Sequence, residues 1–446
     1  MKKTLMFILH ILSPLPLCAV LWHSDPEKYA DPWLLAGMLT GAFAYAWLCA
    51  EFVLIARIRF LEQEFGLDRF FRYHAVIAIA CVALIIAHKQ IEESQLGEMT
   101  AGTVGNIALL VFAAVCLLAV VFMSDTILMR SHAFFRFRKL TEKRLFGRYE
   151  FQVALHNAAA AGLAVMFVHV MMTSGSEASA SVKAAYIAYF SGGTLFYLWH
   201  RLVKRIILAR NPFIVHDVVR HSPVMASLVL VPEKGKVFDY MPGQFGFLRL
   251  RSEGLSMQEH PFSISSDPSD RSKLTLTIKA LGDYTTGIMK LEPGAKAYLD
   301  APYGRFSCAL HPDETSTVLI AGGVGITPAL GMLRYLRTKN PERRIILIWG
   351  ADYERELILR EEFDAMKRDM PQFSLIPVLF RDETWAGEKG IVDEEKIGRI
   401  LGESGLDIQR AGFYICGPAP MLRHVRHALK KIGIKRSNIH FERFSI

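Results

Sequence analysis

The chain of 446 residues is too long for one ordinary domain, and 52% of its residues are hydrophobic. A mean hydropathy of +0.25 is high for a water-soluble protein, and the apolar residues concentrate before residue 210. The net charge of +9 does not indicate nucleic-acid binding, because the basic clusters lie between apolar segments. The six cysteines include no CxxC pair, so neither a zinc site nor a disulfide framework is expected.

An apolar run that ends at Trp22 follows Met1-Lys2-Lys3. This run could be a cleavable signal peptide. A retained helix is favoured instead, because the later topology needs an even number of spans. Pro14 and Pro16 should bend that helix.

Five further apolar segments are each long enough to cross about 30 Å of hydrocarbon. They are Trp33–Arg57, Phe70–Ile91, Val104–Met129, Glu150–Met172 and Lys183–Arg205. Basic connections at 57–72, 130–148 and 204–210 alternate with acidic or nearly neutral ones, which is the pattern of the positive-inside rule. Residues 1–210 are therefore expected to form a six-helix transmembrane bundle. The protein would be a multi-pass cell (inner) membrane protein, surrounded by the lipid bilayer, with both termini cytoplasmic.

Two of these segments carry a histidine near each end. His74 and His88 lie 14 positions apart, and His156 and His169 lie 13 apart, so each pair spans roughly 20 Å along a helix axis. Ionisable residues at membrane depth are costly and usually functional. Four of them, matched at two depths, predict two stacked b-type haems with imidazole ligands from two helices. We name His74 and His156 the inner pair, and His88 and His169 the outer pair.

The two spacings differ in their helical geometry. Fourteen residues return within about 40° of the starting face, whereas thirteen miss it by about 140°. Either the second helix is distorted, for example by a bulge near Gly162, or its two ligands approach their haems from different sides. Four unrelated membrane histidines are the alternative interpretation.

The composition changes near Asn211-Pro212, and short strands with turn signals follow. The strands expected first are Ala226–Val231, Gly246–Leu250, Lys273–Ala280 and Lys296–Asp300. They predict an antiparallel β-barrel at 211–312. The later ones are Thr317–Ala321, Arg344–Trp349, Ser374–Val378 and Gly412–Cys416. Because these alternate with helical segments, they predict an α/β nucleotide-binding domain with a parallel sheet at 313–446.

The segment His260-Pro261-Phe262-Ser263-Ile264-Ser265-Ser266 follows the barrel's first strands. It resembles the flavin motif HPFTxxS of the NADPH oxidase and ferric reductase family. The order of helices, paired histidines, barrel and nucleotide domain extends this resemblance over nearly the whole chain. The resemblance implies a ferric reductase-like membrane domain fused to a cytosolic ferredoxin-reductase-like module that binds FAD. Ser263 stands where many members carry Thr, and it keeps the hydroxyl that positions the flavin ring.

The resemblance also implies the remaining FAD contacts. His260 matches the family's phosphate-side residue, and Pro261, Phe262 and Ser266 belong to the same motif. The segment Gly282-Asp283-Tyr284-Thr285-Thr286 resembles the family's GDxT segment, so Asp283, Thr285 and Thr286 would lie at the pyrophosphate by a helix N-terminus.

A glycine-rich turn lies between a predicted strand and a predicted helix. It reads Gly322-Gly323-Val324-Gly325-Ile326-Thr327-Pro328, and Cys416-Gly417-Pro418 follows later in the chain. Small residues let backbone N–H groups approach a dinucleotide pyrophosphate. The family's GGxGxTP and CGP segments bracket the nicotinamide, so the expected contacts include Gly322, Gly323, Gly325, Thr327, Pro328, Gly417 and Pro418. Cys416 is either close to the hydride path or a small buried residue.

Arg381 follows the third strand of this domain, where related reductases place a cation for the 2′-phosphate of NADPH. Asp352, after the second strand, could disfavour that phosphate. NADPH is the expected donor, with NADH as the alternative. Phe444 matches a terminal aromatic residue that stacks on the flavin and gates the nicotinamide; ordinary packing of a terminal strand is the alternative.

Together these features predict an NAD(P)H oxidase or ferric reductase, with Ser263, Cys416 and Phe444 as catalytic candidates. NADPH would reduce FAD, and single electrons would pass through two haems to an acceptor on the far side. Oxygen, giving superoxide, is the first choice. A ferric chelate is the second, because Glu92 stands where oxidase members carry a histidine. Alternatively the chain could donate electrons to an extracytoplasmic redox protein, or be a membrane-tethered flavin reductase without haem.

Overall fold

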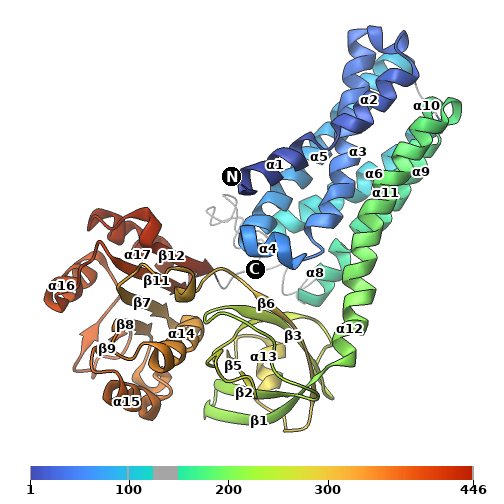
Figure 1. The fold of residues 1–446 in the computed structure, drawn as a ribbon. Helices are drawn as coiled ribbons and strands as arrows, with labels where there is room; N and C mark the ends of the chain where they lie inside the picture. The colour runs from blue at the N-terminus through green and yellow to red at the C-terminus, as the bar shows by residue number, and fades with distance from the viewer. Residues whose placement is uncertain (1, 98–99, 124–148, 444–446) are drawn as a thin grey trace. The chain divides into compact units, whose positions relative to one another are not determined.

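The computed structural model describes residues 2–97, 100–123 and 149–443 (Figure 1). The chain divides into two compact units, Met1–Arg205 and Ile206–Ile446. The first unit is helical, and the second contains two six-stranded sheets. The basic cluster expected at 130–148 lies outside the described residues.

The helical unit is built from the apolar segments of the sequence. Its helices are α1 (Lys2–Leu12), α2 (Leu15–Ser24), α3 (Pro32–Leu54), α4 (Arg59–Phe65), α5 (Leu67–Leu96), α6 (Thr100–Leu118), α8 (Tyr149–His156), α9 (Ala158–Met171), α10 (Ser174–Ala178), α11 (Ala180–Leu198) and α12 (Lys204–Arg210). The start of α3 is well defined, because the Asp31 carboxylate accepts hydrogen bonds from the backbone N–H groups of Trp33 (2.8 Å) and Leu34 (3.0 Å). The bend expected in the first apolar run is confirmed, since α1 and α2 are separate helices divided at Ser13-Pro14.

Five helical segments in the described part of the chain are long and apolar enough to cross a membrane. They are Met6–Ser24, Pro32–Leu54, Arg69–Leu96, Gly102–Val121 and Gln152–Met171. The sixth expected span, at α11, is not among them, because Lys183, Ser191 and Thr194 dilute its apolar content. The six-helix bundle therefore stays a prediction.

Helix α3 is the central element of the helical unit. Cys49 on α3 lies so close to α11 that a Cβ built on Gly193 would be 2.6 Å from the Cys49 carbonyl oxygen. Tyr45, also on α3, donates a hydrogen bond to the Tyr186 carbonyl of α11 (2.9 Å). Small residues that permit such close approach are typical of packing between membrane helices. Helix α3 also packs beside α5, which carries two of the four histidines.

The first sheet of the second unit is antiparallel, with strand order β4-β3-β6-β1-β2-β5. The strands are β1 (Phe213–Ser222), β2 (Met225–Pro232), β3 (Phe245–Arg251), β4 (His260–Ser263), β5 (Leu274–Lys279) and β6 (Lys296–Tyr303). A bridge between Ile264 and Leu276 joins the end of β4 to β5, so the two edges meet and the sheet curls into the expected barrel. Strand β1 was not expected, because its polar positions interrupt the alternation.

The second sheet is parallel, with strand order β10-β9-β8-β7-β11-β12. Its strands are β7 (Ser316–Gly322), β8 (Arg344–Ala351), β9 (Phe373–Leu379), β10 (Glu388–Lys389), β11 (Ala411–Gly417) and β12 (Ile439–Arg443). Helices α14 (Ile326–Lys339) and α15 (Arg360–Asp369) pack on one face, and α16 (Glu394–Ser404) and α17 (Ala419–Lys431) on the other. The predicted α/β domain is confirmed. The chain reverses direction across the sheet between β7 and β11, which makes this the topological switch point.

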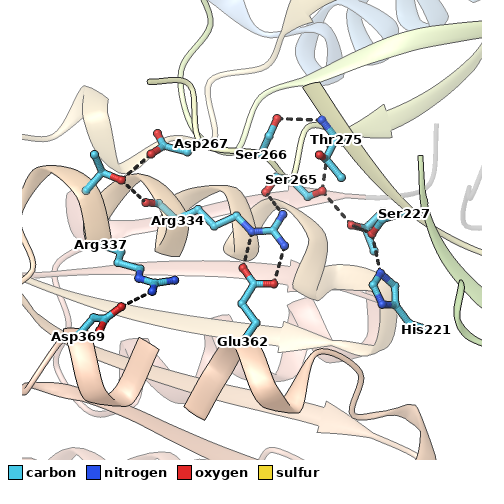
Figure 2. A network of polar contacts seen from close by, with 12 residues as sticks. His221, Ser227, Ser265, Ser266, Asp267, Thr275, Arg334, Arg337, Glu362 and Asp369 are labelled. Atoms are coloured by element: carbon cyan, nitrogen blue, oxygen red, sulfur yellow. Dashed lines mark hydrogen bonds and ion pairs between the residues drawn. The ribbon is translucent and has the colours of Figure 1, made fainter. Parts of the chain in front are cut away.

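A polar network joins the barrel to the α/β domain (Figure 2). The Arg334 guanidinium on α14 binds both Glu362 carboxylate oxygens of α15, each at 2.7 Å, and donates to the Ser265 carbonyl of the barrel at 2.6 Å. Thr338 donates to Asp267 at 2.6 Å. The end of β4 is therefore held against the first helix of the nucleotide domain.

Candidate functional site

The four histidines predicted as haem ligands form two close pairs. His74 and His88 lie on α5, His156 is the last residue of α8, and His169 lies on α9. The ring centres of the inner pair are 5.9 Å apart with an interplanar angle of 76°. Those of the outer pair are 6.4 Å apart at 75°. Both pairs therefore bring one imidazole from each of two helical segments close together, with the two rings nearly perpendicular.

A break in the second helical segment explains the spacing of 13 residues. Helix α8 ends at His156, Asn157 is a turn residue, and α9 begins at Ala158. The Ala160 N–H donates to the Asn157 carbonyl (3.1 Å), a tighter i−3 bond than the helix itself makes. The expected distortion is therefore present, but at Asn157. The suggested location near Gly162 is wrong, because Gly162 lies within the regular turns of α9, packed against Phe112.

Helix α3 supplies a partner for both histidines of α5. The His88 Nδ1 atom hydrogen-bonds the Gly37 carbonyl oxygen at 2.9 Å. The His74 Nδ1 atom contacts the Glu51 carboxylate. Glu51 and Gly37 are 14 positions apart, the same spacing as His74 and His88, which fits two helices packed side by side. With Nδ1 engaged in this way, Nε2 is the ring nitrogen of each α5 histidine that would serve as a metal ligand.

Glycines leave room for the outer pair. A Cβ built on Gly41 would lie 2.9 Å from the His88 ring, and one built on Gly105 would lie 3.0 Å from the His169 ring. Two imidazoles bound to one metal ion at about 2 Å each have ring centres roughly 6 Å apart. The histidine pairs match this separation and have oriented Nδ1 atoms on α5, so the residues fit bis-histidine haem ligation.

The flavin-motif residues lie on an edge strand of the barrel. Strand β4 carries His260 to Ser263 and lies at one end of the strand order, paired with β3. Proline is tolerated at such an edge, which accounts for Pro261. Ser263 is buried at the end of the strand, opposite Phe245. The His260 ring stacks on Tyr284 of α13 (Asp283–Ile288) with ring centres 3.8 Å apart. The structure thus brings the two flavin segments together.

Several flavin-motif hydroxyls also hold the local fold. The Ser266 Oγ atom accepts from the Thr275 N–H at 3.0 Å and bonds the Tyr240 hydroxyl at 2.9 Å. Thr285 Oγ1 accepts from the N–H groups of Leu281 (2.9 Å) and Gly282 (3.0 Å). Asp283 opens α13, and the Thr286 N–H donates to the Gly282 carbonyl. Ser266 and Thr285 therefore have a structural role whether or not they touch FAD.

The two glycine-containing nucleotide segments meet at the switch point. A Cβ built on Gly325 would lie 2.1 Å from the Cys416 carbonyl oxygen, and one on Gly417 would lie 3.1 Å from the Gly322 backbone. Gly323 has a positive φ of 54°, and a Cβ there would meet nothing within 4 Å. The turn is therefore tightly packed against β11, whereas there is space beside Gly323. Dinucleotides bind outside the carboxyl ends of the strands at such a point.

The other predicted nucleotide residues divide into buried and exposed positions. Thr327 and Pro328 are buried in the first turn of α14, where the Thr327 hydroxyl donates to the Val324 carbonyl (3.0 Å). Cys416 is 2% exposed at the end of β11, and Pro418 begins α17. Arg381 is largely exposed after β9 and lies 3.7 Å from the Asp352 carboxylate. The two residues that were expected to influence the 2′-phosphate in opposite senses therefore form an ion pair.

The end of the chain approaches the same edge of the sheet. Strand β12 pairs with β11 in parallel, with Gly417 opposite Arg443. Phe444 lies outside the described residues, so its stacking role stays a prediction. A polar cluster fastens β12: Glu314 accepts from Tyr414 and from His440, each at 2.6 Å. Burial and the adjacent Glu314 carboxylate raise the pKa of the Tyr414 hydroxyl, which keeps that hydroxyl a donor.

Sequence reasoning missed the partners of these predicted residues. Glu51 could have been found, because it is an acidic residue inside an apolar segment long enough to cross a membrane. Gly37 and Asn157 act through their backbone, which carries no residue-type signal. The Arg334–Glu362 pair has no local pattern either, because its two members come from different helices.

Comparison with known proteins supports the reading of the second unit. The chain matches the FAD-binding domain family over residues 222–322 and the oxidoreductase NAD-binding domain family over 319–427. No family model of a transmembrane ferric reductase domain matches.

Among curated proteins, the chain is 31% identical over 250 residues to a flavohemoprotein of Rhizobium meliloti, covering 52% of this chain and 60% of that protein. It is 30% identical over 231 residues to the stachydrine N-demethylase reductase subunit Stc4 of the same organism, covering 50% and 64%. The chain thus spans less than two thirds of the length of these relatives. A solved FAD/NAD-binding domain of nitric oxide dioxygenase from Vibrio cholerae is 24% identical, with a TM-score of 0.47 over 52% of this chain and 98% of that one.

The second unit is therefore a ferredoxin–NADP reductase-type module, with an FAD-binding domain followed by an NAD(P)H-binding domain. A module of this class belongs to oxidoreductases that use both cofactors.

Proposed function

We propose that this chain carries electrons from cytosolic NAD(P)H across a membrane, through FAD and two bis-histidine b haems. The observation that carries the proposal is the two pairs of imidazoles, with ring centres 5.9 Å apart in one pair and 6.4 Å apart in the other, inside an apolar helical unit of the same chain as a flavin reductase module. Unrelated histidines have no reason to face one another twice, and the break at Asn157 lets one helical segment supply both.

The FAD supplies the conversion between two-electron hydride chemistry and the single electrons that haem iron accepts. In this chain the edge strand β4, with buried Ser263, would hold the flavin ring. The open turn at Gly323 would hold the nucleotide. Cys416 ends β11 at the same edge, beside the tight turn at Gly325. These residues bind and orient, and their contribution is to bring the nicotinamide to the flavin.

The membrane placement follows from charge and length. Five described helical segments can cross a bilayer, and the basic connections alternate with acidic or neutral ones. The proposal retains six crossings of a cell (inner) membrane with both termini in the cytoplasm. It also assigns the inner pair, His74 and His156, to the cytoplasmic side of the membrane.

The acceptor on the far side would be reduced without binding to the haem, because His88 and His169 would together hold that group. Oxygen, giving superoxide, is the first candidate. A ferric chelate is the second, because Glu92 stands where the resemblance to oxidases would place a histidine; its carboxylate lies close to Gly37, whose carbonyl binds His88. An extracytoplasmic redox protein is a third candidate, in which case the chain would be its electron donor.

The test is an absorbance spectrum of the full chain purified in detergent, combined with a haemochrome assay and NADPH oxidation. The proposal expects two low-spin b haems per chain that become reduced when NADPH is added without oxygen. Superoxide formation, with and without ferric chelate, then separates the acceptors. A haem-free, NADPH-oxidising protein would instead establish the tethered flavin reductase.

A further inference from the structure

The two proposed haem sites differ in the group that binds the back of the α5 histidine. At the inner pair this group is the Glu51 carboxylate, and at the outer pair it is the Gly37 backbone carbonyl. Both partners come from α3. Each site brings one α5 imidazole near one imidazole of the second segment at a similar distance. The Glu92 carboxylate lies beside Gly37 at the outer pair, but the direct partner of the α5 histidine is a carboxylate at the inner pair and an uncharged carbonyl at the outer pair.

Glu51 is held in place for this contact. The residue is 4% exposed on α3, and one carboxylate oxygen meets His74 Nδ1. The other oxygen, Oε1, is buried and has no hydrogen-bond partner among the described residues. A buried carboxylate with a half-satisfied hydrogen-bonding capacity is expensive in an apolar unit. The presence of the Glu51 carboxylate at this position points to a role that a neutral residue could not perform.

A carboxylate behind a metal-bound imidazole makes that imidazole a more basic ligand. A more basic, partly anionic ligand stabilises the ferric state over the ferrous state, so it lowers the reduction potential; hydrogen bonding to an axial ligand is one of the means by which proteins set haem potentials. A backbone carbonyl does the same to a smaller extent, because it carries no net charge.

We propose that Glu51 is a positioning residue that makes the inner haem the lower-potential site of the two. This rests on the proposed function, because it requires both haems. Electrons that enter at the inner pair would then move to a site of higher potential at the outer pair. The inner iron would lose one electron and the outer iron would gain it. The Glu51 side chain would thus set the direction of electron transfer across the membrane.

The experiment is an anaerobic redox titration of the purified full chain, followed through the absorbance of the b haems. The wild type should show two one-electron components. Glu51→Gln keeps a hydrogen-bond acceptor and removes the charge. It should raise the lower component so that the ferric-to-ferrous ratio at a given potential falls at least about tenfold, which is about 59 mV. The higher component and the haem content should stay unchanged.

A matched control removes one negative charge elsewhere in the same unit. Glu93 on α5 is an exposed residue that pairs with Lys89 across one helical turn, so Glu93→Gln makes the same change in net charge. It should leave both components where they are. A shift of both components in Glu51→Gln, or of neither, would overturn the assignment of Glu51.

A second variant keeps the test decisive if Glu51→Gln fails to incorporate haem. His88→Ala removes an outer ligand and should leave only the inner haem, whose potential should equal the lower wild-type component. If it equals the higher component, the proposal is wrong. If the wild type contains no haem at all, the proposed function fails instead, so the two failures are distinguishable.

Discussion

The two units of this chain build their candidate sites in opposite ways. The sheet-containing unit uses short contiguous segments, such as the turn from Gly322 to Gly325, whose backbone meets Cys416 at the end of a neighbouring strand. The helical unit uses single side chains that lie up to 95 positions apart, from His74 to His169. Contiguous sites leave a motif in the sequence. Dispersed sites leave only residue types at suggestive depths, and their geometry depends on how helices pack.

The largest expected effect tests whether the two sites work in series. His88→Ala should abolish reduction of the proposed far-side acceptor, because it removes a ligand of the proposed outer haem. Flavin reduction by NADPH should be unchanged, since the variant lies in the other unit. Stopped-flow flavin bleaching and a steady-state acceptor assay measure the two steps. Normal acceptor reduction in this variant would show that electrons do not pass through the outer pair.

The next effect tests the contiguous site. Gly325→Ala would place a methyl group 2.1 Å from the Cys416 carbonyl oxygen, so the turn must move away from β11. We expect weaker NADPH binding and a loss of about 1–3 kcal/mol in the free energy of unfolding. Gly323→Ala meets no atom within 4 Å but has a positive φ, so it should cost less stability. Equal losses of stability in the two variants would count against the packing of this turn.

These two variants also show what the sequence could predict. The parallel sheet, the barrel and the glycine turn were predictable, because strands and turns carry local patterns. The sequence predicted that the second helix is distorted, because 13 residues of a regular helix would place His156 and His169 on different faces. It did not predict that the distortion lies at Asn157, because no local pattern marks that residue. Arg334 was not predictable, because its partner Ser265 is far away in sequence. Glu51 could have been noticed as an acidic residue in an apolar segment, but nothing in the sequence indicated its contact with His74.

A third prediction concerns the joint between the barrel and the nucleotide domain. Arg334→Ala removes a bidentate pair whose side chains are only 19% and 25% exposed, together with a bond to the barrel. We expect a loss of about 1–3 kcal/mol in unfolding free energy. Arg337→Ala, which breaks a more exposed pair with Asp369, should cost under about 1 kcal/mol. Chemical denaturation of the two variants measures the difference, and a larger loss in Arg337→Ala would contradict the assignment.

A smaller effect is expected at the nucleotide ribose. Arg381→Ala should lower the preference for NADPH over NADH by about tenfold or less, since an exposed charge contact contributes at most about 1.4 kcal/mol. Asp352→Asn, which frees Arg381 from its ion pair, should change the preference in the opposite direction. The measurement is the ratio of kcat/KM for NADPH to kcat/KM for NADH. An unchanged ratio in both variants would show that Arg381 and Asp352 do not contribute to recognition of the 2′-phosphate.

The smallest effect is a pH dependence of the barrel. Burial, with a further contribution from nearby Arg334 and opposed by Glu362, lowers the pKa of His221. The unfolded chain therefore binds a proton here at higher pH than the folded chain, and stability should fall as the pH drops below about 6.5. His221→Gln should flatten this decline in thermal unfolding measured from about pH 7.5 to 5.5. An identical decline in both proteins would exclude His221 as its source.

The most direct test of the whole account is the haem content of the full chain and its response to NADPH without oxygen. We expect two low-spin b haems per chain, both reduced after NADPH is added, and only one in the His88→Ala variant. A purified protein that binds FAD and oxidises NADPH but shows no haem absorbance would contradict it.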